Sequence, residues 1–153
     1  MEKRDQLIQD LDEARQQMAG VLEQIDTEQE LYPGWTIKHV LAHITGWDEA
    51  TIDSLKAHAA DTESSVPAYR GIDDYNAKSV ETRAVLSYER VYREWEQVRG
   101  ELKDVLRAMP PEKFSGDLLL PWSERGSIDY VIGILVHHEK EHAEEIRQLL
   151  AKK

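Results

Sequence analysis

The sequence predicts an all-α protein, built as a four-helix bundle in one domain that spans residues 1–153. Apolar residues recur at alternating spacings of three and four, which is the period of helices that bury one side. Proline and glycine gather between these segments, and no strand of consequence is predicted. The composition, 41% hydrophobic and 32% charged, is that of a helical protein with a buried core.

Two helices are expected in the first part of the chain. The first runs from about Arg4 to Ile25, with its apolar side formed by Leu7, Leu11, Ala14, Met18, Val21 and Ile25. Pro33 and Gly34 then break the pattern, and Thr36 is a suitable cap for a second helix that ends near His58.

The second part of the chain begins with a polar connection, residues 59–72, which is long enough to cross the molecule. The second and third helices therefore need not be antiparallel neighbours. A third helix is expected to run without interruption from Asp73 to the stop at Pro110, with at most a bend at Gly100. The loop that follows contains "DLLL", a candidate extended piece, and the fourth helix starts near Ser127.

Charge and composition exclude several classes of function. Nineteen Lys and Arg against 30 Asp and Glu give a net charge of −11, which disfavours binding to nucleic acid or to anionic membranes. The chain contains no cysteine, so thiolate metal sites and a cysteine nucleophile are excluded. No apolar run has the length of a membrane span, and the polar start predicts no signal peptide, so a cytoplasmic location is expected.

The fourth helix carries two histidines on its apolar side. His138 and His142 are four residues apart, so both imidazoles can reach one ion from the same face of the helix. With Glu139 they form the pattern H-E-x-x-H. A bundle site draws further ligands from facing helices, and His43, at the edge of the apolar side of the second helix, is the strongest candidate.

The remaining histidines are expected to play other parts. His39 lies near the start of its helix beside a lysine and is expected to be solvated, and His58 is expected to be exposed. His137 lies 100° from His138 on the helix, so packing beside the site, rather than binding an ion, is expected.

Better known sites with similar motifs do not fit. A zinc protease needs a third ligand beyond the helix and a sheet for its peptide substrate, whereas Ala143–Lys153 continue the same helix. A di-iron bundle needs a second E-x-x-H pair, which the sequence lacks. Nothing indicates a haem pocket or a nucleophile elbow.

Candidate catalytic groups follow from position alone. Glu139 and Asp48 are potential general bases or partners of the metal ligands, although a solvated carboxylate explains each of them equally well. Three tryptophans, Trp35, Trp47 and Trp122, would wall a pocket beside the metal or serve as core. Three neutral imidazoles leave an open coordination position, and Zn²⁺ or Ni²⁺ suits them best.

Three stretches resemble the DinB/YfiT-like superfamily of metal-dependent four-helix bundles. These are "GWTIKHVLAHITGWDEA" in the second helix, "PWSERGSIDYVIG" before the fourth and "HHEKEHAEEI" within it. The second helix and "IDDYNAKSVETRAVLSYERV" are most similar to the ClbS/DfsB-like branch. The resemblance implies an up-down-down-up order of helices and a divalent metal on His43, His138 and His142, the three residues already selected by spacing.

The resemblance also implies a range of functions. Activities in the superfamily include transferases and isomerases that use mycothiol or bacillithiol, and a hydrolase that acts on a reactive metabolite. We therefore expect a metal-dependent transferase or hydrolase that acts on a small electrophilic molecule, with a low-molecular-weight thiol as a further expected cofactor. The alternative is a bundle that binds or sequesters a metal or metabolite without catalysis, or that serves as a dimer scaffold. A homodimer is expected from the resemblance and from the apolar excess on the first and third helices.

Overall fold

The computed structural model describes residues 2–152 and is mostly helical. Its elements, in chain order, are α1 (Lys3–Leu22), α2 (Ile37–Ala59), α3 (Ile72–Thr82), α4 (Tyr88–Ala108), the short 3₁₀ helix η1 (Pro111–Ser115), β1 (Leu118–Leu119), β2 (Arg125–Gly126) and α5 (Ile128–Ala151).

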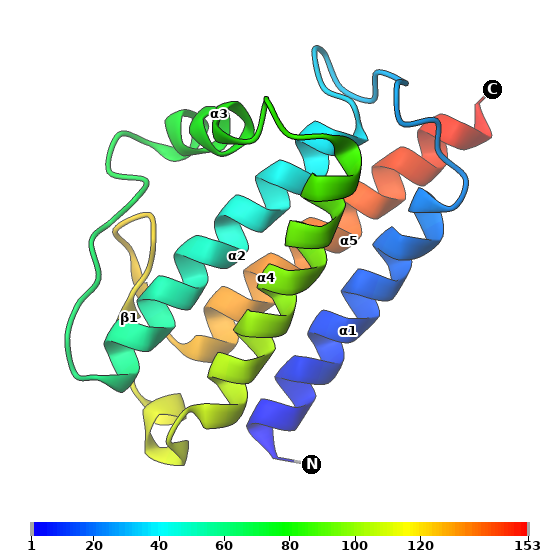
Figure 1. The fold of residues 1–153 in the computed structure, drawn as a ribbon. Coiled ribbons are helices and arrows are strands. Elements are labelled where there is room, and N and C mark those ends of the chain that lie inside the picture. The colour runs from blue at the N-terminus through cyan, green and yellow to red at the C-terminus, as the bar shows by residue number, and fades with distance from the viewer. Residues whose placement is uncertain (1, 153) are drawn as a thin grey trace.

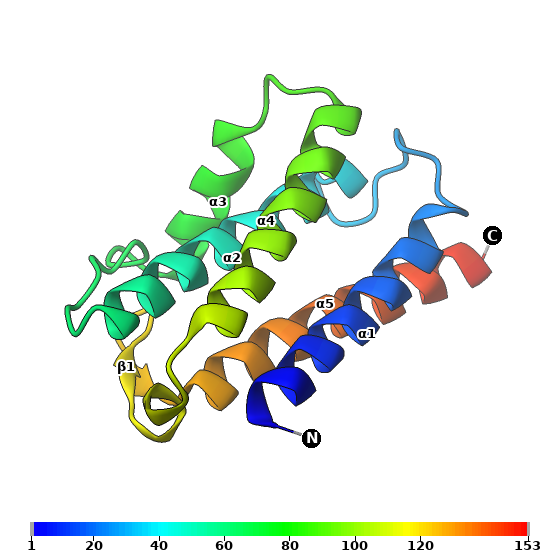
Figure 2. The ribbon, with the colours of Figure 1, turned by 60° about the horizontal axis from the view of Figure 1, so that its bottom comes forward.

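Four long helices form the bundle, with α1 packed along α5 and α2 packed along α4 (Figure 1). Along the chain α1 runs up, α2 and α4 run down, and α5 runs up again. The parallel α2 and α4 are joined by the long connection that carries α3, which lies outside the bundle (Figure 2). The predicted four-helix bundle and its up-down-down-up order are confirmed.

The single third helix expected from the sequence is wrong, because this segment forms two helices. The chain leaves the helical path after Thr82, and Ser87 caps a new helix by accepting a hydrogen bond from Arg90 N at 3.2 Å. Val85, counted as part of the apolar side, is 93% exposed in the turn between them. Gly100 lies within an unbroken α4. The cap at Ser87 therefore overrides an apolar period that continues through the break.

The α3 helix lies against α2 at a point where α2 has no side chain. Tyr75 Oη donates a hydrogen bond to the carbonyl of Gly46 at 2.7 Å, and a Cβ at Gly46 would collide with Ser79. Glycine at this position therefore allows the two helices to approach closely. This contact holds Ile72 and Asn76 of α3 beside the cleft described below.

The loop before α5 contains the extended piece expected at "DLLL". Leu118 pairs with Gly126 and Leu119 with Arg125 in a two-stranded antiparallel ribbon. Ser127 then caps α5 by accepting a hydrogen bond from Tyr130 N at 3.1 Å.

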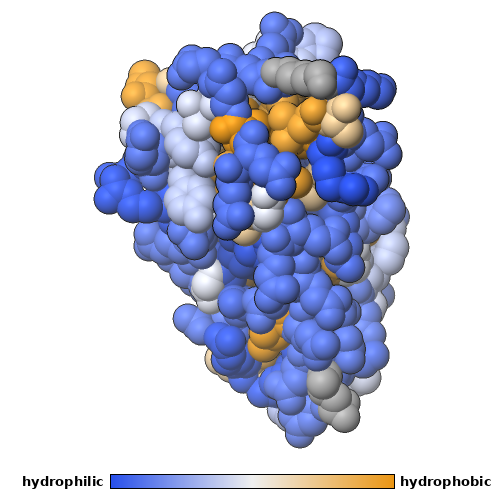
Figure 3. All heavy atoms as spheres, turned by 90° about the vertical axis from the view of Figure 1, so that its right-hand side faces the viewer, coloured by the Kyte–Doolittle hydropathy of each residue, from blue (hydrophilic) through white to orange (hydrophobic). Residues whose placement is uncertain are grey.

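A buried polar layer divides the core into two apolar parts. One part packs the first half of α1 against the second halves of α2 and α4 and the start of α5, and the other packs the opposite end of the bundle. Between them lie the buried side chains of His43, Asp48, Arg99 and Glu139. The surface is largely hydrophilic on the face formed by α1 and the end of α5, with a small hydrophobic area near the end of α5 (Figure 3). Within residues 2–152, every helix is too short or too polar to cross a membrane.

Candidate metal centre

Three histidines from two helices converge at one point. His43 of α2 lies opposite His138 and His142 of α5, and one ring nitrogen of each lies within 4.8 Å of the others. His138 Nε2 lies 2.9 Å from His43 Nε2 and 3.0 Å from His142 Nε2. The structure thus brings together all three residues expected as ligands.

The hydrogen bonds around the cluster indicate where the ring protons lie. Tyr32 Oη donates to Glu145 Oε1 at 2.6 Å, so its oxygen accepts from His142 Nδ1 at 2.8 Å. The proton of His142 is therefore on Nδ1, and Nε2 presents a lone pair to the other rings.

This arrangement fits a divalent cation. His138 Nε2 faces two imidazole nitrogens, and a ring nitrogen takes part in only one in-plane hydrogen bond, so at least one of the two contacts is not a hydrogen bond. His43 Nδ1 is also buried without a hydrogen-bond partner among the described residues. A cation between the rings would accept a lone pair from each of the three nitrogens, and three nitrogen ligands suit Zn²⁺ or Ni²⁺.

Burial keeps the three rings neutral. It lowers the pKa of His43 to about 3 and that of His138 to about 4, and the neighbouring imidazoles act in the same direction. Burial also lowers the pKa of His142. Metal ions compete with protons for imidazole nitrogen, so rings that stay neutral near pH 7 are ready to bind.

A tight turn before α2 covers one side of the cluster. Tyr32 and Trp35 close the turn through a 2.8 Å hydrogen bond from Trp35 N to Tyr32 O, with Pro33 second and Gly34 third at φ +79°. This is the pattern of a type II turn, which needs glycine at its third position. The turn places Trp35 5.3 Å from His43 between ring centroids, and Tyr32 5.5 Å from His142.

The cluster opens onto a cleft of about 1040 Å³ between α2, α3, α5 and the loop before α5. The cleft is lined by the three histidines, by three tryptophans as expected from the sequence (Trp35, Trp47 and Trp122), by Ile72, Asn76, Tyr130, Gly133, Ile134, Leu135 and His137, and by four acidic residues (Glu124, Asp129, Glu141 and Glu145). Trp47 is fixed by a 2.6 Å hydrogen bond from its Nε1 to Asn76 Oδ1.

The other histidines take different positions from those expected. His39 is half-buried, and its Nδ1 accepts a hydrogen bond from Thr36 N at 2.8 Å, so it caps α2 and is not simply solvated. His58, expected to be exposed, is half-buried against the carbonyl of Lys113. His137, expected to pack, has an exposed side chain at the cleft, 3.0 Å from Glu141.

Glu139 and Asp48 lie in the buried polar layer rather than in the cleft. Arg99 Nη1 lies 2.9 Å from Glu139 Oε1, and Arg99 Nε lies 2.9 Å from Asp48 Oδ2. Burial alone would lower the pKa of Arg99, but the two carboxylates outweigh it and raise that pKa. Neither carboxylate lines the cleft. The alternative expectation, that both carboxylates are solvated, is wrong, because both are buried.

Two further residues complete the layer, and sequence reasoning assigned neither of them, nor Arg99, to a site. Arg15 of α1 donates to Glu139 Oε2 at 3.2 Å, and Trp95 Nε1 of α4 donates to the same oxygen at 3.1 Å. All four bundle helices therefore meet at this layer. The sequence contained one signal of this layer, because Arg99 is a charged residue that lies with Val98 and Leu102 on the apolar side of its helix.

The buried face of α5 is rotated about the helix axis relative to the apolar side that the sequence predicted. Glu139 and Ala143 are on the buried face, which is completed by Ile128, Val131, Ile132, Leu135 and Ile146. His138 and His142 flank this face and are half-buried toward the cleft. The offset leaves both imidazoles accessible to a molecule in the cleft.

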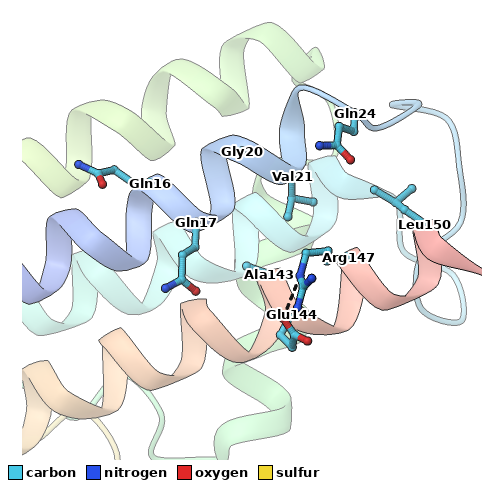
Figure 4. A pocket seen from close by; sticks show the side chains of 9 residues that line it. All are labelled: Gln16, Gln17, Gly20, Val21, Gln24, Ala143, Glu144, Arg147 and Leu150. Carbon is cyan, nitrogen blue, oxygen red and sulfur yellow. Dashed lines mark hydrogen bonds and ion pairs between the residues drawn. The ribbon is translucent and has the colours of Figure 1, made fainter.

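A second depression, of about 450 Å³, lies between α1 and α5 (Figure 4). Its lining includes Gln16, Gln17, Val21 and Leu150, and its two charged side chains, Glu144 and Arg147, pair with each other. It contains no histidine and no unpaired ionic group, so the histidine cleft is the better candidate for a functional site.

Comparison with known proteins agrees with this geometry. Residues 5–127 match the model of the mycothiol maleylpyruvate isomerase N-terminal domain. The chain belongs to this family. It is thereby a member of the DinB/YfiT-like superfamily, as expected from the sequence. The matched residues include His43, whereas α5 lies beyond them. The closer placement in the ClbS/DfsB-like branch stays a prediction.

Solved structures share the fold of this family member at low sequence identity. The crystal structure of the mycothiol-dependent maleylpyruvate isomerase has a TM-score of 0.76 and 14% identity, and a mutant of it has 0.77 and 13%. Both matches cover 94% of this chain but only 60% of the isomerase. An uncharacterised protein from Escherichia coli UTI89 has a TM-score of 0.79 and 14% identity, with 97% of this chain and 92% of that chain covered. No curated protein matches the sequence.

Proposed function

We propose that the protein is a metal-dependent transferase or hydrolase that acts on a small electrophilic molecule, with the metal on His43, His138 and His142. The observation that carries this proposal is the convergence of three neutral imidazoles at the wall of an open cleft. A structural metal would instead be expected in a closed shell of four protein ligands.

The family and the solved isomerase that shares its fold suggest a thiol co-substrate. The isomerase depends on mycothiol, so a low-molecular-weight thiol is proposed as the nucleophile here as well. A divalent ion on three imidazoles would supply Lewis acidity at an open position, which favours ionisation of a thiol or a water near neutral pH.

Other residues of the chain would orient the ligands and hold the substrate. Tyr32 fixes the proton of His142 on Nδ1 and so keeps its Nε2 available. Trp35, Trp47 and Trp122 provide flat walls that hold an apolar body and exclude water. Glu145 accepts a hydrogen bond from Tyr32 Oη at the cleft edge and lies 3.7 Å from His142 Nδ1.

Glu139 and Asp48 are proposed as positioning residues rather than as bases. Both carboxylates are held by Arg99, and a base must reach the proton that it removes. Through Arg99 they join α2 to α5, the two helices that carry the ligands.

Elemental analysis of the protein as isolated tests the metal. One equivalent of Zn or Ni is expected in the wild type, with a large loss in His43→Ala. His39→Ala is the matched control, because His39 is on the same helix and outside the cluster. Metal-free wild type, or equal metal in wild type and His43→Ala, would contradict the proposal.

A sequestering protein without turnover is the second candidate, favoured by the absence of a free base among the described residues that touch the cluster. Thiol conjugation or hydrolysis that is lost on chelation and restored by added metal would decide for the enzyme.

A further inference from the structure

We propose that the cleft accepts a substrate whose body is flat, apolar and either neutral or cationic, and that it discriminates against substrates with additional carboxylates. This inference rests on the proposed function, because it concerns what enters the same site. The charge and shape of the cleft lining carry it.

The lining holds four carboxylates and no Lys or Arg. Three of these carboxylates have only uncharged or weakly basic partners: Glu124 accepts from Trp122 Nε1 at 3.1 Å, Glu145 from Tyr32 Oη at 2.6 Å, and Glu141 lies 3.0 Å from His137 Nε2. Asp129 alone pairs with a lysine, the exposed Lys3 of α1. We call these four carboxylates, Glu124, Asp129, Glu141 and Glu145, the acidic rim of the cleft. This rim therefore keeps most of its negative charge.

An arginine beside the cleft, Arg70, is not part of its lining. Arg70 lines a neighbouring depression, which shares Ile72 and Trp122 with the cleft and contains Asp73 and Asp74 as well. Its side chain is directed to Tyr69, where Nε donates to the hydroxyl at 3.0 Å. Asp73 and Asp74 lie beside Arg70, and Asp74 also pairs with Lys78, so this side of the approach adds no excess of positive charge over these two carboxylates.

An ion in the cluster would attract one anionic atom of a ligand, and the acidic rim would then face the rest of the molecule. A carboxylate on that remainder would meet like charges beside low-dielectric aromatic walls, where repulsion is strengthened. An ammonium group there would meet carboxylates and tryptophan faces, both of which attract cations.

The walls favour a flat body. Trp47 packs edge-on to Trp122 with 5.8 Å between ring centroids, and the rim includes Ile72 and Tyr130, which are 51% and 46% exposed. Apolar side chains left open to solvent at the mouth of a cleft gain stability when an apolar ligand covers them.

Binding of three matched thiols to the Co²⁺-loaded protein tests the inference. 4-Mercaptobenzoate, 4-mercaptobenzamide and (4-mercaptophenyl)trimethylammonium share the thiol and ring and differ in charge, and thiolate binding is followed by the charge-transfer absorption of Co²⁺. The benzoate is expected to bind at least about tenfold more weakly than the other two, with the difference shrinking at high salt. Equal or tighter binding of the benzoate overturns the inference.

Two variants assign the effect to the rim. Glu124→Gln and Glu141→Gln are expected to strengthen benzoate binding several-fold, whereas Glu101→Gln, an exposed position on α4, removes the same charge elsewhere and is expected to leave it unchanged. An equal shift in all three variants would reduce the effect to net charge and overturn the inference.

Tryptophan quenching separates this inference from the proposed function, because it needs neither metal nor thiol. Three of the four tryptophans line the cleft, and the fourth, Trp95, is buried. In metal-free protein, quenching by iodide relative to neutral acrylamide is expected to rise in Glu124→Gln and not in Glu101→Gln. An unchanged ratio refutes the negative cleft. If iodide behaves as expected but none of the thiols alters the Co²⁺ spectrum, the thiol-dependent form of the proposed function fails and the charge of the cleft stands.

Discussion

Arg99 Nη1 of α4 lies 2.9 Å from Glu139 Oε1 of α5, and this ion pair is fully buried. Glu139 is next to His138 in sequence, yet it faces the centre of the bundle while His138 faces the cleft. The same guanidinium binds Asp48, which follows His43 by five residues on α2. One arginine thus links the two helices that carry the histidines of the proposed metal site.

Loss of Arg99 is expected to destabilise the protein strongly. Arg99→Met leaves two carboxylates in the core with reduced compensation, and breaking a buried ion pair from one side costs about 3–5 kcal/mol. The measurement is urea denaturation of the metal-free protein. Lys103→Met is the control, because Lys103 is also on α4 and pairs with Asp12 of α1 at the surface, and such pairs contribute about 0–1 kcal/mol. Similar losses in both variants would contradict a central role for the layer.

Removing the hydroxyl of Tyr32 is expected to weaken metal binding without unfolding the protein. Tyr32→Phe deletes the group that holds the His142 proton on Nδ1, and loss of such a partner typically costs about 10- to 100-fold in metal affinity. Competition with a chromophoric chelator measures the affinity for Zn²⁺. Tyr88→Phe, on α4, serves as the control, and equal affinities in both variants would show that the hydroxyl does not orient the ligand.

A methyl group at Gly46 is expected to displace α3. Gly46→Ala places a Cβ against Ser79, and overpacking of this kind costs about 1–3 kcal/mol. Hydrogen exchange of residues 72–82 should accelerate more than exchange in α1. The same substitution at Gly100 meets no atom within 4 Å and should be neutral or stabilising by up to about 1 kcal/mol. Unchanged protection of α3 in Gly46→Ala would refute the close approach.

The metal-free protein is expected to lose stability as the pH falls from about 6.5 toward 5. His43 and His138 have folded-state pKa values of about 3 and 4, below the ordinary value of about 6.5 expected in the unfolded chain, so the unfolded state binds more protons in this range. The expected loss is roughly 1–2 kcal/mol for each buried ring. Urea midpoints at both pH values measure it.

Two substitutions separate this effect from general acid sensitivity. His43→Gln should reduce the fall in stability between pH 6.5 and 5, and His137→Gln, at an exposed position, should not. If wild type and His43→Gln respond equally to pH, the rings are not buried in neutral form.

Local patterns were sufficient where each helix begins with its own cap and keeps its own apolar period. The helices α1, α2 and α5 and the extended piece at "DLLL" were predicted in this way. The α4 helix was predicted only as the second part of one long helix, and the parallel order of α2 and α4 followed from the family resemblance. The break at Ser87 was missed, because Val85 continues an apolar period that the folded chain does not bury. Periodicity describes what a helix would bury, whereas burial itself depends on a partner surface.

The sequence by itself determined the bundle and selected His43, His138 and His142, since the spacing of side chains along a helix is fixed by its geometry. Only the tertiary structure decided what surrounds them. Tyr32, Arg15 and Arg99 reach their partners across 40 to 124 positions in the chain, and helix rotation decided that Glu139 faces Arg99 while its neighbour faces the cleft. A rotation of 100° between adjacent residues separates these two environments, and packing among four helices, rather than local pattern, sets that rotation.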